Sequence, residues 1–155
     1  MIKILFICHG NICRSPMAEF IMKELVRKEG LSDLFDIASR ATSYEEIGND
    51  MYPPAKEKLL KEGVPFSRRR AARLTRAEYE SYDLIICMDK MNVRNTLRII
   101  GEDSDNKLRL LSDYAGLSRD IADPWYSGDF DRAYEDILSG CIGLLSELNG
   151  KIKGR

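Results

Sequence analysis

The chain has 155 residues, of which 44% are hydrophobic and 32% charged, and its formal net charge at pH 7 is -1. This length suits a single domain spanning residues 1–155, and the near-neutral charge excludes a general attraction to nucleic acids or acidic membranes. Because the sequence shows neither a signal-peptide pattern nor an apolar run of about 18 residues, we expect a cytoplasmic protein with reduced cysteines and no membrane association.

Apolar runs typical of strands alternate with stretches of helical periodicity along the chain. The predicted strands cover residues 2–8, 34–42, 83–89 and 107–112. The first and third runs are almost continuously apolar, which is typical of parallel strands buried on both faces. The sequence therefore predicts an α/β fold, Rossmann-like, with a four-stranded parallel sheet flanked by helices on both faces.

Capping residues predict where the helices begin. Ser15 is expected to cap the first helix with Pro16 at its first position, and Thr75 with Glu78 forms the pattern of a capping box. Pro53-Pro54 is expected to begin a further helix, and Asp89 is expected to cap another. A last helix is predicted over an apolar face from Phe130 to Leu148 that contains the unfavourable Gly140 and Gly143.

The segment CHGNICRS, residues 8–15, follows the first strand and opens the first helix, where backbone N–H groups and the helix dipole bind anions. Gly10 and Asn11 tolerate the positive φ angles that such a nest of N–H groups needs. Arg14 adds a planar fork suited to two phosphate oxygens. These donors favour a thiolate at Cys8, beneath a bound phosphate and in line with phosphorus. The pattern favours a catalytic phosphate loop.

Three other interpretations of this segment remain open at this point. Cys8 and Cys13 have a spacing that zinc sites use, although Cys87 and Cys141 lie far away in sequence and His9 lies inside the loop. The same two cysteines could form a structural disulfide, or could be core residues around a plain strand-to-helix turn.

A second motif, DPWY at residues 123–126, supplies an acid for the leaving oxygen of a phosphate ester. Asp123 precedes Pro124, so its backbone is expected to be extended. The aromatic Trp125 and Tyr126 suit a phenolic leaving group. A surface Asp-Pro turn is the alternative for this motif alone.

The segment CHGNICRSP carries a Cys-x5-Arg-Ser signature and resembles that of the low-molecular-weight protein tyrosine phosphatases. DPWY resembles the late Asp-Pro-aromatic-aromatic motif of that family, and residues 39–49 and 82–92 resemble other family segments, so that the likeness runs from about Lys3 to about Leu148. The resemblance implies the fold of that family and hydrolysis of phosphotyrosine and aryl phosphates. It implies no metal and no organic cofactor, with phosphotyrosine proteins as partners and inorganic phosphate as product or inhibitor.

The resemblance also implies a role for each site residue. Cys8 would form a cysteinyl-phosphate, Arg14 would bind the phosphoryl oxygens, and Asp123 would act first as acid and then as base. Asn11 and Ser39 would brace the loop, Ser15 would hydrogen-bond Cys8, and Cys13 would form a reversible disulfide with Cys8 upon oxidation. The phosphate-binding residues implied are His9, Gly10, Asn11, Ile12, Cys13, Arg14 and Ser15.

Some positions depart from the family pattern. His9 stands where an apolar residue is common, and Tyr44-Glu45 stands where many relatives place an aromatic wall residue. We expect Tyr44, Glu45, Trp125 and Tyr126 to form the substrate wall. The cluster Arg68–Arg70 is interpreted either as a contact for acidic phosphopeptides or as a solvated face, and Ala72 replaces a common arginine.

Three competing functions follow from the same loop. Thioredoxin-coupled arsenate reductases need a later pair of cysteines, whereas this chain has only Cys87 in that region. Protein-arginine phosphatases tend to carry threonine in place of Ile12 and lack the paired aromatic residues. A non-catalytic phosphate-binding module needs neither Cys8 nor Asp123.

Overall fold

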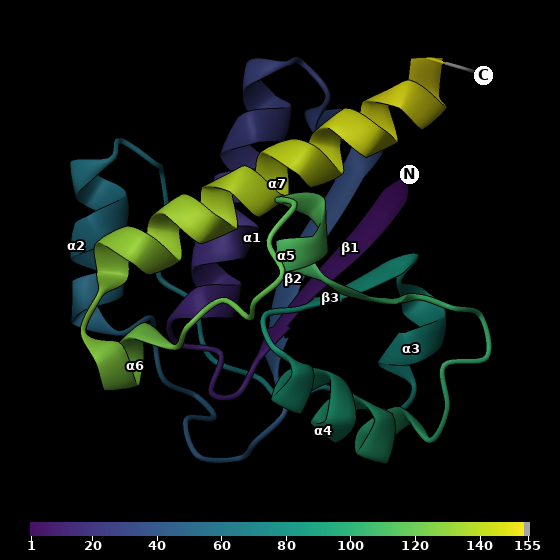
Figure 1. Ribbon diagram of the computed structural model, residues 1–155, viewed down its shortest axis with the longest axis horizontal. Coiled ribbons are helices and arrows are strands. Elements are labelled where there is room, and N and C mark those ends of the chain that lie inside the picture. Colours follow the sequence, from purple (N-terminus) through teal and green to yellow (C-terminus); the bar gives the residue numbers. More distant parts are fainter. Residues whose placement is uncertain (154–155) are drawn as a thin grey trace.

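The computed structural model describes residues 1–153 and shows strands alternating with helices around one sheet (Figure 1). The elements, in chain order, are β1 (Ile2–Cys8), α1 (Arg14–Lys28), a 3-10 turn η1 (Ser32–Leu34), β2 (Phe35–Ala41), α2 (Pro53–Lys61), α3 (Glu78–Ser81), β3 (Leu84–Cys87), α4 (Lys90–Ile100), β4 (Leu108–Leu110), α5 (Leu111–Tyr114), α6 (Pro124–Ser127) and α7 (Phe130–Lys153). No helix among these residues is long and apolar enough to cross a membrane.

The four strands are parallel and lie in the order β2-β1-β3-β4. The chain therefore winds outward from β1 to β2 in one direction, then returns to β3 and β4 in the other. At such a switch in winding direction, the loops that follow β1 and β3 diverge and leave a crevice beyond the carboxyl ends of the strands. Both the Cys8 loop and Asp89 lie at this place.

Alternate side chains of β1 enter two separate cores. Ile4 and Phe6 pack with buried residues of α1, α2 and α7, whereas Leu5 and Ile7 pack with buried residues of α3 and α4. In Figure 1, α7 crosses α1 on one side of the sheet, and α3 and α4 lie on the other. This arrangement confirms the predicted four-stranded parallel sheet with helices on both faces.

The start of α1 differs from the prediction. The helix begins at Arg14, so Ser15 does not cap it and Pro16 is its third residue rather than its first. The Ser15 hydroxyl lies instead 3.0 Å from the Cys8 Sγ atom, and it accepts a hydrogen bond from the Asn11 side chain. Proline is still tolerated there because the N–H groups of the first helical turn have no partner within the helix.

The predictions for two other helix starts, at Asp89 and at Thr75, had different outcomes. Asp89 caps α4 in a full capping box with Asn92, as its position predicts for a helix after β3. The Thr75 prediction was wrong about the helix start, because a turn comes first and α3 begins only at Glu78. The Glu78 carboxylate does accept a hydrogen bond from the Thr75 N–H, so one half of the capping box forms.

Candidate active site

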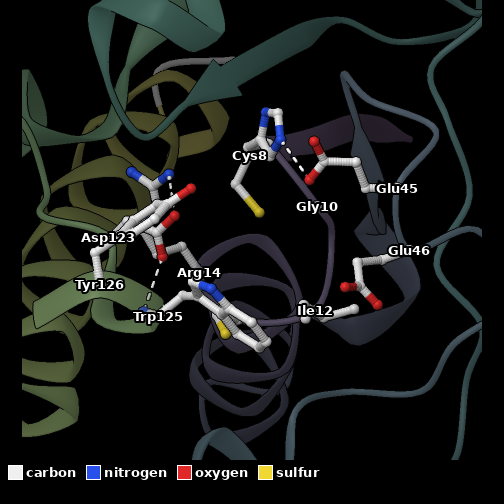
Figure 2. A pocket seen from close by; sticks show the side chains of 11 residues that line it. Cys8, Gly10, Ile12, Arg14, Glu45, Glu46, Asp123, Trp125 and Tyr126 are labelled. Atoms are coloured by element: carbon white, nitrogen blue, oxygen red, sulfur yellow. Dashed lines mark hydrogen bonds and ion pairs between the residues drawn. The ribbon is translucent and has the colours of Figure 1, made fainter. Parts of the chain in front are cut away.

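A cavity opens where the loop from Cys8 to Arg14 joins the end of β1 to the start of α1 (Figure 2). Its lining brings together three segments that are distant in sequence: the loop itself, the segment after β2, and the start of α6. The lining residues are Cys8, His9, Gly10, Ile12, Cys13, Arg14, Glu45, Glu46, Asp123, Trp125 and Tyr126. Most of the residues predicted for the site therefore meet in one place.

The Cys8 side chain points into this cavity and is 3% exposed (Figure 2). Its Sγ atom lies 3.0 Å from the Ser15 hydroxyl oxygen and accepts a weak hydrogen bond from the Ser15 N–H at 3.4 Å. Donors at the N-terminus of a helix stabilise a thiolate. Because the helix begins two residues earlier than predicted, at Arg14, Ser15 lies where it can stabilise negative charge on Cys8.

Asn11 holds the loop in shape from behind. Its φ angle is +58°, in the left-handed region that asparagine tolerates better than most residues. Its side-chain amide donates to the hydroxyls of Ser15 at 2.8 Å and Ser39 at 2.9 Å, and its carbonyl oxygen accepts from the Ala72 N–H at 3.2 Å and from Arg69. All four hydrogen-bonding positions of this buried amide are filled.

Arg14 is buried at one side of the cavity and uses only part of its guanidinium for protein contacts. Its Nη1 donates to Asp89 at 2.7 Å and to the Ile121 carbonyl at 2.8 Å, and its Nη2 lies 3.5 Å from an Asp123 carboxylate oxygen. The Nε atom has no hydrogen-bond partner among residues 1–153. The Nε–Nη2 edge, with its parallel donors, is therefore left for a ligand with two oxygens.

Negatively charged groups near Arg14 keep its guanidinium protonated. Burial works against this protonation, but Cys8, Asp89 and Asp123 outweigh burial and hold the pKa of Arg14 above its ordinary value. Asp89 was predicted only as a helix cap. Its contact with Arg14 could not be predicted, because nothing in the sequence shows that the loops after β1 and β3 meet.

Asp123 reaches the cavity from the start of α6. Its backbone is extended, as its position before Pro124 predicts, and one carboxylate oxygen caps the short helix by accepting from the Trp125 N–H at 3.0 Å. The other oxygen is the one near Arg14. The side chain is about a quarter exposed, at 24%, so water also reaches it.

The walls of the cavity differ in chemistry. Ile12 and Trp125 present apolar surface, and the Trp125 ring rests on Tyr52 with 4.6 Å between ring centroids. Glu45 and Glu46 lie on another side (Figure 2). Glu46 was not predicted, although it belongs to the same loop as Glu45.

Four predicted residues do not line the cavity. Asn11, Ser15 and Ser39 lie behind it as supports. Tyr44 lies away from it, with the Arg73 guanidinium 4.3 Å above its ring. Within the cluster Arg68–Arg70, the backbone N–H of Arg69 donates to Asp50 and its side chain to Asn11, so this arginine faces the loop and not an open surface.

The cysteines are free thiols in this structure. Burial, and then the nearby Cys8 and Asp123, raise the pKa of the Cys13 thiol far above its ordinary value. Burial likewise raises the pKa of Cys87 to about 12. Among residues 1–153, no three histidine, cysteine or acidic side chains gather in a way that would hold a metal ion.

The sequence model of one family, described as low molecular weight phosphotyrosine protein phosphatase, matches residues 3–153. The chain belongs to this family, which confirms the resemblance seen in its motifs. It is accordingly a protein-tyrosine phosphatase, an enzyme of the hydrolase class.

Individual relatives agree with this assignment. The chain is 35% identical over 150 residues to the low molecular weight protein-tyrosine-phosphatase YfkJ of Bacillus subtilis, covering 96% of each chain. The crystal structure of YfkJ matches with a TM-score of 0.93 at 34% identity, covering 97% of this chain and 96% of that one.

Two further solved structures share the fold. That of SP-PTP, a low molecular weight protein tyrosine phosphatase from Streptococcus pyogenes, matches with a TM-score of 0.86 at 37% identity over 96% of this chain and 93% of that one. That of DARP, a Drosophila arginine phosphatase, matches with a TM-score of 0.87 at 28% identity over 95% of this chain and 98% of that one. The fold alone therefore does not select the phosphorylated amino acid.

Proposed function

We propose that this protein hydrolyses phosphotyrosine in proteins, and aryl phosphates, through a cysteinyl-phosphate intermediate on Cys8, with Asp123 as general acid and base. The observation that carries the proposal is the set of groups around the cavity. A thiol with hydrogen-bond donors behind it, a guanidinium edge without a protein partner, and a carboxylate from another segment all converge there.

In the first step, the phosphoryl oxygens accept hydrogen bonds from the N–H groups of residues 9–14 and from the Nε–Nη2 edge of Arg14. The Cys8 thiolate attacks phosphorus in line, so that a P–S bond forms while the P–O bond to the phenol breaks. Asp123 donates its proton to the departing phenolic oxygen, which leaves as a neutral phenol. The N–H groups and Arg14 stabilise the charge that develops on the equatorial oxygens.

In the second step, Asp123 is a carboxylate and accepts a proton from a water molecule, whose oxygen attacks phosphorus. The P–S bond breaks and its electron pair returns to Cys8. The hydroxyl and N–H of Ser15 stabilise the departing thiolate, which supports a role for them in turnover. The product is inorganic phosphate, which fits the same loop and would inhibit at high concentration.

The cavity walls support tyrosine as the phosphorylated residue. The side chains of Ile12 and Trp125 offer apolar surface to an entering aryl ring. The Trp125 side chain is 49% exposed, so a substrate ring would cover surface that now faces water.

The test uses p-nitrophenyl phosphate, which has a good leaving group, and phenyl phosphate, which has a poor one. Cys8→Ser should abolish turnover of both. Asp123→Asn should slow phenyl phosphate by about 10²-fold or more and p-nitrophenyl phosphate by less, because the poor leaving group needs the proton more. Asp120→Asn, at an exposed aspartate in the same segment, serves as the control and should leave both rates unchanged.

The outcomes separate the competing functions. Wild-type turnover by Cys8→Ser would contradict the nucleophile, and equal slowing of both substrates by Asp123→Asn would contradict the acid. Assays of phosphotyrosine, phosphoarginine and arsenate under the same conditions then test the substrate. A preference for phosphoarginine, or reduction of arsenate with a thioredoxin supplied, would replace the proposal with one of the alternatives.

A further inference from the structure

One wall of the cavity carries two neighbouring carboxylates that the reaction proposed above does not use. They belong to Glu45 and Glu46, in the segment that follows β2, and both line the cavity that contains Cys8. Figure 2 shows them across the cavity from Asp123, Trp125 and Tyr126. A cavity that must admit a phosphate dianion gains nothing from acidic groups at its wall, so their presence calls for another explanation.

Both carboxylates are held in place by contacts with their surroundings. The Glu45 carboxylate lies 3.0 Å from the Nε2 atom of His9, in the phosphate loop. The Glu46 carboxylate accepts a hydrogen bond of 2.7 Å from the side chain of Asn49, and its Cγ lies 3.4 Å from the position that a Cβ on Gly10 would occupy. Glu46 is therefore packed against the loop itself.

The basic side chains near Glu46 already have other partners or contacts. Of the basic residues lining the cavity, Arg14 is paired with Asp89 and Asp123, and is left with one edge for the phosphate. His9 is the other, and its Nε2 atom contacts Glu45, so that Glu46 has no basic partner among the lining residues. Arg73 lies on the Tyr44 ring and donates to the Thr42 carbonyl, outside the cavity lining. With phosphate in the loop, the acidic wall keeps an excess of negative charge.

The opposite wall favours the same kind of partner. Tyr126 is 82% exposed and Trp125 half exposed, so their ring faces are open to a substrate beside the cavity. Aromatic faces attract Lys and Arg side chains and offer nothing comparable to acidic ones. A residue next to the phosphorylated one thus meets carboxylates on one side and aromatic rings on the other.

We infer that Glu45 and Glu46 make the enzyme select phosphotyrosines flanked by lysine or arginine. This inference rests on the proposed function, since it concerns the residues beside the phosphotyrosine in that same cavity. The selection acts through charge at a solvent-exposed rim, so it is expected to raise kcat/KM mainly through association, and to weaken as salt screens the carboxylates.

The experiment compares three phosphotyrosine peptides that differ only in the two residues on each side of the phosphotyrosine, which are lysine, serine or glutamate. Phosphate release gives kcat/KM for each at low ionic strength. We expect the lysine peptide to exceed the glutamate peptide by about tenfold, with the serine peptide between them, and the ratio to fall toward about twofold in 0.5 M salt.

The double variant Glu45→Gln/Glu46→Gln should reduce the lysine-to-glutamate ratio to about twofold at low ionic strength. The matched control is Glu80→Gln/Glu102→Gln, which removes the same charge from exposed positions before β3 and β4, at the ends of the strands remote from the cavity. This control should retain the tenfold ratio.

Two results would overturn the inference while the proposed function stands. One is equal hydrolysis of the three peptides, or preference for the glutamate peptide, by the wild-type enzyme. The other is a ratio that the Glu45→Gln/Glu46→Gln variant leaves unchanged. Hydrolysis of none of the three, with phosphoarginine cleaved in their place, would instead overturn the proposed function and this inference with it.

Discussion

At the scale of single residues, Asn11 connects the phosphate loop to the rest of the protein. Its amide is bonded to α1 through Ser15, to β2 through Ser39, and to the segment before α3 through Ala72 and Arg69. Its positive φ is the conformation that a loop needs if successive N–H groups are to face one side. The residue therefore serves the backbone conformation and the side-chain network together.

The variant Asn11→Ala tests the backbone conformation and the side-chain network together. Asn106, a second asparagine with a positive φ, provides the control for the backbone conformation. Alanine adopts a positive φ at a cost of about 1–2 kcal/mol and leaves the buried hydroxyls of Ser15 and Ser39 without their donor. We expect kcat to fall about tenfold or more and the free energy of unfolding to fall by about 2–4 kcal/mol. Asn106 has a φ of +54° on the surface, where its side chain accepts an exposed hydrogen bond from Arg109, so Asn106→Ala should show the backbone cost with little added loss and full activity. Equal activity of the two variants would contradict the role of the network.

Cys13 is the second residue whose role can be tested. It lines the same cavity as Cys8, and its buried thiol, with a raised pKa, is no competitor for the nucleophile. Hydrogen peroxide should convert the Cys8 thiolate to a sulfenic acid with release of hydroxide, and the Cys13 thiol should then attack that sulfur, releasing water and forming a disulfide. Activity should return with dithiothreitol.

Mass analysis after mild peroxide treatment checks this redox prediction. The wild-type protein should yield a peptide pair linked through Cys8 and Cys13, whereas Cys13→Ser should progress to irreversible sulfinic acid at Cys8. Cys87→Ser removes a buried thiol outside the cavity and should behave like the wild-type protein. Oxidised Cys8 without any link to Cys13 would rule the mechanism out.

At the scale of elements, the glycines that weaken the prediction of α7 have a packing role. A Cβ on Gly143 would lie 2.0 Å from the Tyr114 carbonyl oxygen, and one on Gly140 would lie 2.5 Å from the Leu111 side chain. The short helix α5 therefore approaches the backbone of α7 directly. Without glycine at these positions, the chain between β4 and α6 could not pack as it does.

Gly143→Ala should consequently reduce the free energy of unfolding by about 2–4 kcal/mol, because backbone atoms cannot move aside as a flexible side chain does. Gly150 lies in the same helix with nothing within 4 Å of the position that a Cβ would occupy, so Gly150→Ala should stabilise the protein by up to about 1 kcal/mol through helix propensity. Urea denaturation of both variants measures the difference. A Gly143→Ala variant as stable as the wild type would show that α5 yields readily.

The elements that the sequence predicted well share one property: their signals are local. Each signal depends on residues that are close together in the sequence. The examples are the apolar run of β1, the capping residue Asp89 and the apolar face of α7. The predicted start of α1 was two residues too late because the Ser15 hydroxyl bonds to Cys8 and Asn11 in preference to a helix N–H. The short helices α5 and α6 are set by packing and by the Asp123 side chain, and carry too few residues for a periodic signal.

At the scale of the whole molecule, the candidate site depends on the winding of the sheet. Cys8, Arg14 and Asp123 were recognised from motifs, and the structure places them in one cavity. Asp89, Arg69 and Glu46 were not recognised as part of the site. Each meets the loop only because segments after β2 and β3 fold back to the carboxyl end of β1, and such contacts between distant segments leave no periodic or spacing signal in one sequence.

Opposite the site, Asp103 joins α3 to the start of β4 and affects the stability of the entire fold. One carboxylate oxygen accepts from the Tyr79 hydroxyl at 2.5 Å and the Lys107 N–H at 2.7 Å, and the other accepts from the Leu108 N–H at 3.1 Å. Burial opposes ionisation, but these hydrogen bonds outweigh it and hold the pKa of Asp103 below its ordinary value. The folded state therefore favours the ionised carboxylate more than the unfolded state does.

The stability that Asp103 contributes should be complete above the pKa of an unfolded aspartate, about 3.9, and should be lost as the pH falls through its lower folded-state pKa. Urea denaturation of the wild type and Asp103→Asn from pH 2.5 to 7 measures this. The difference in free energy of unfolding should be constant above about pH 5 and should shrink below about pH 4, since the other carboxylates titrate in both proteins and cancel. Asp105→Asn, at an exposed neighbour, should show little difference at any pH. The difference in free energy of unfolding between the wild type and Asp103→Asn could also persist unchanged at pH 2.5. That result would mean that the packing of the Asp103 side chain, and not its charge, stabilises the loop before β4.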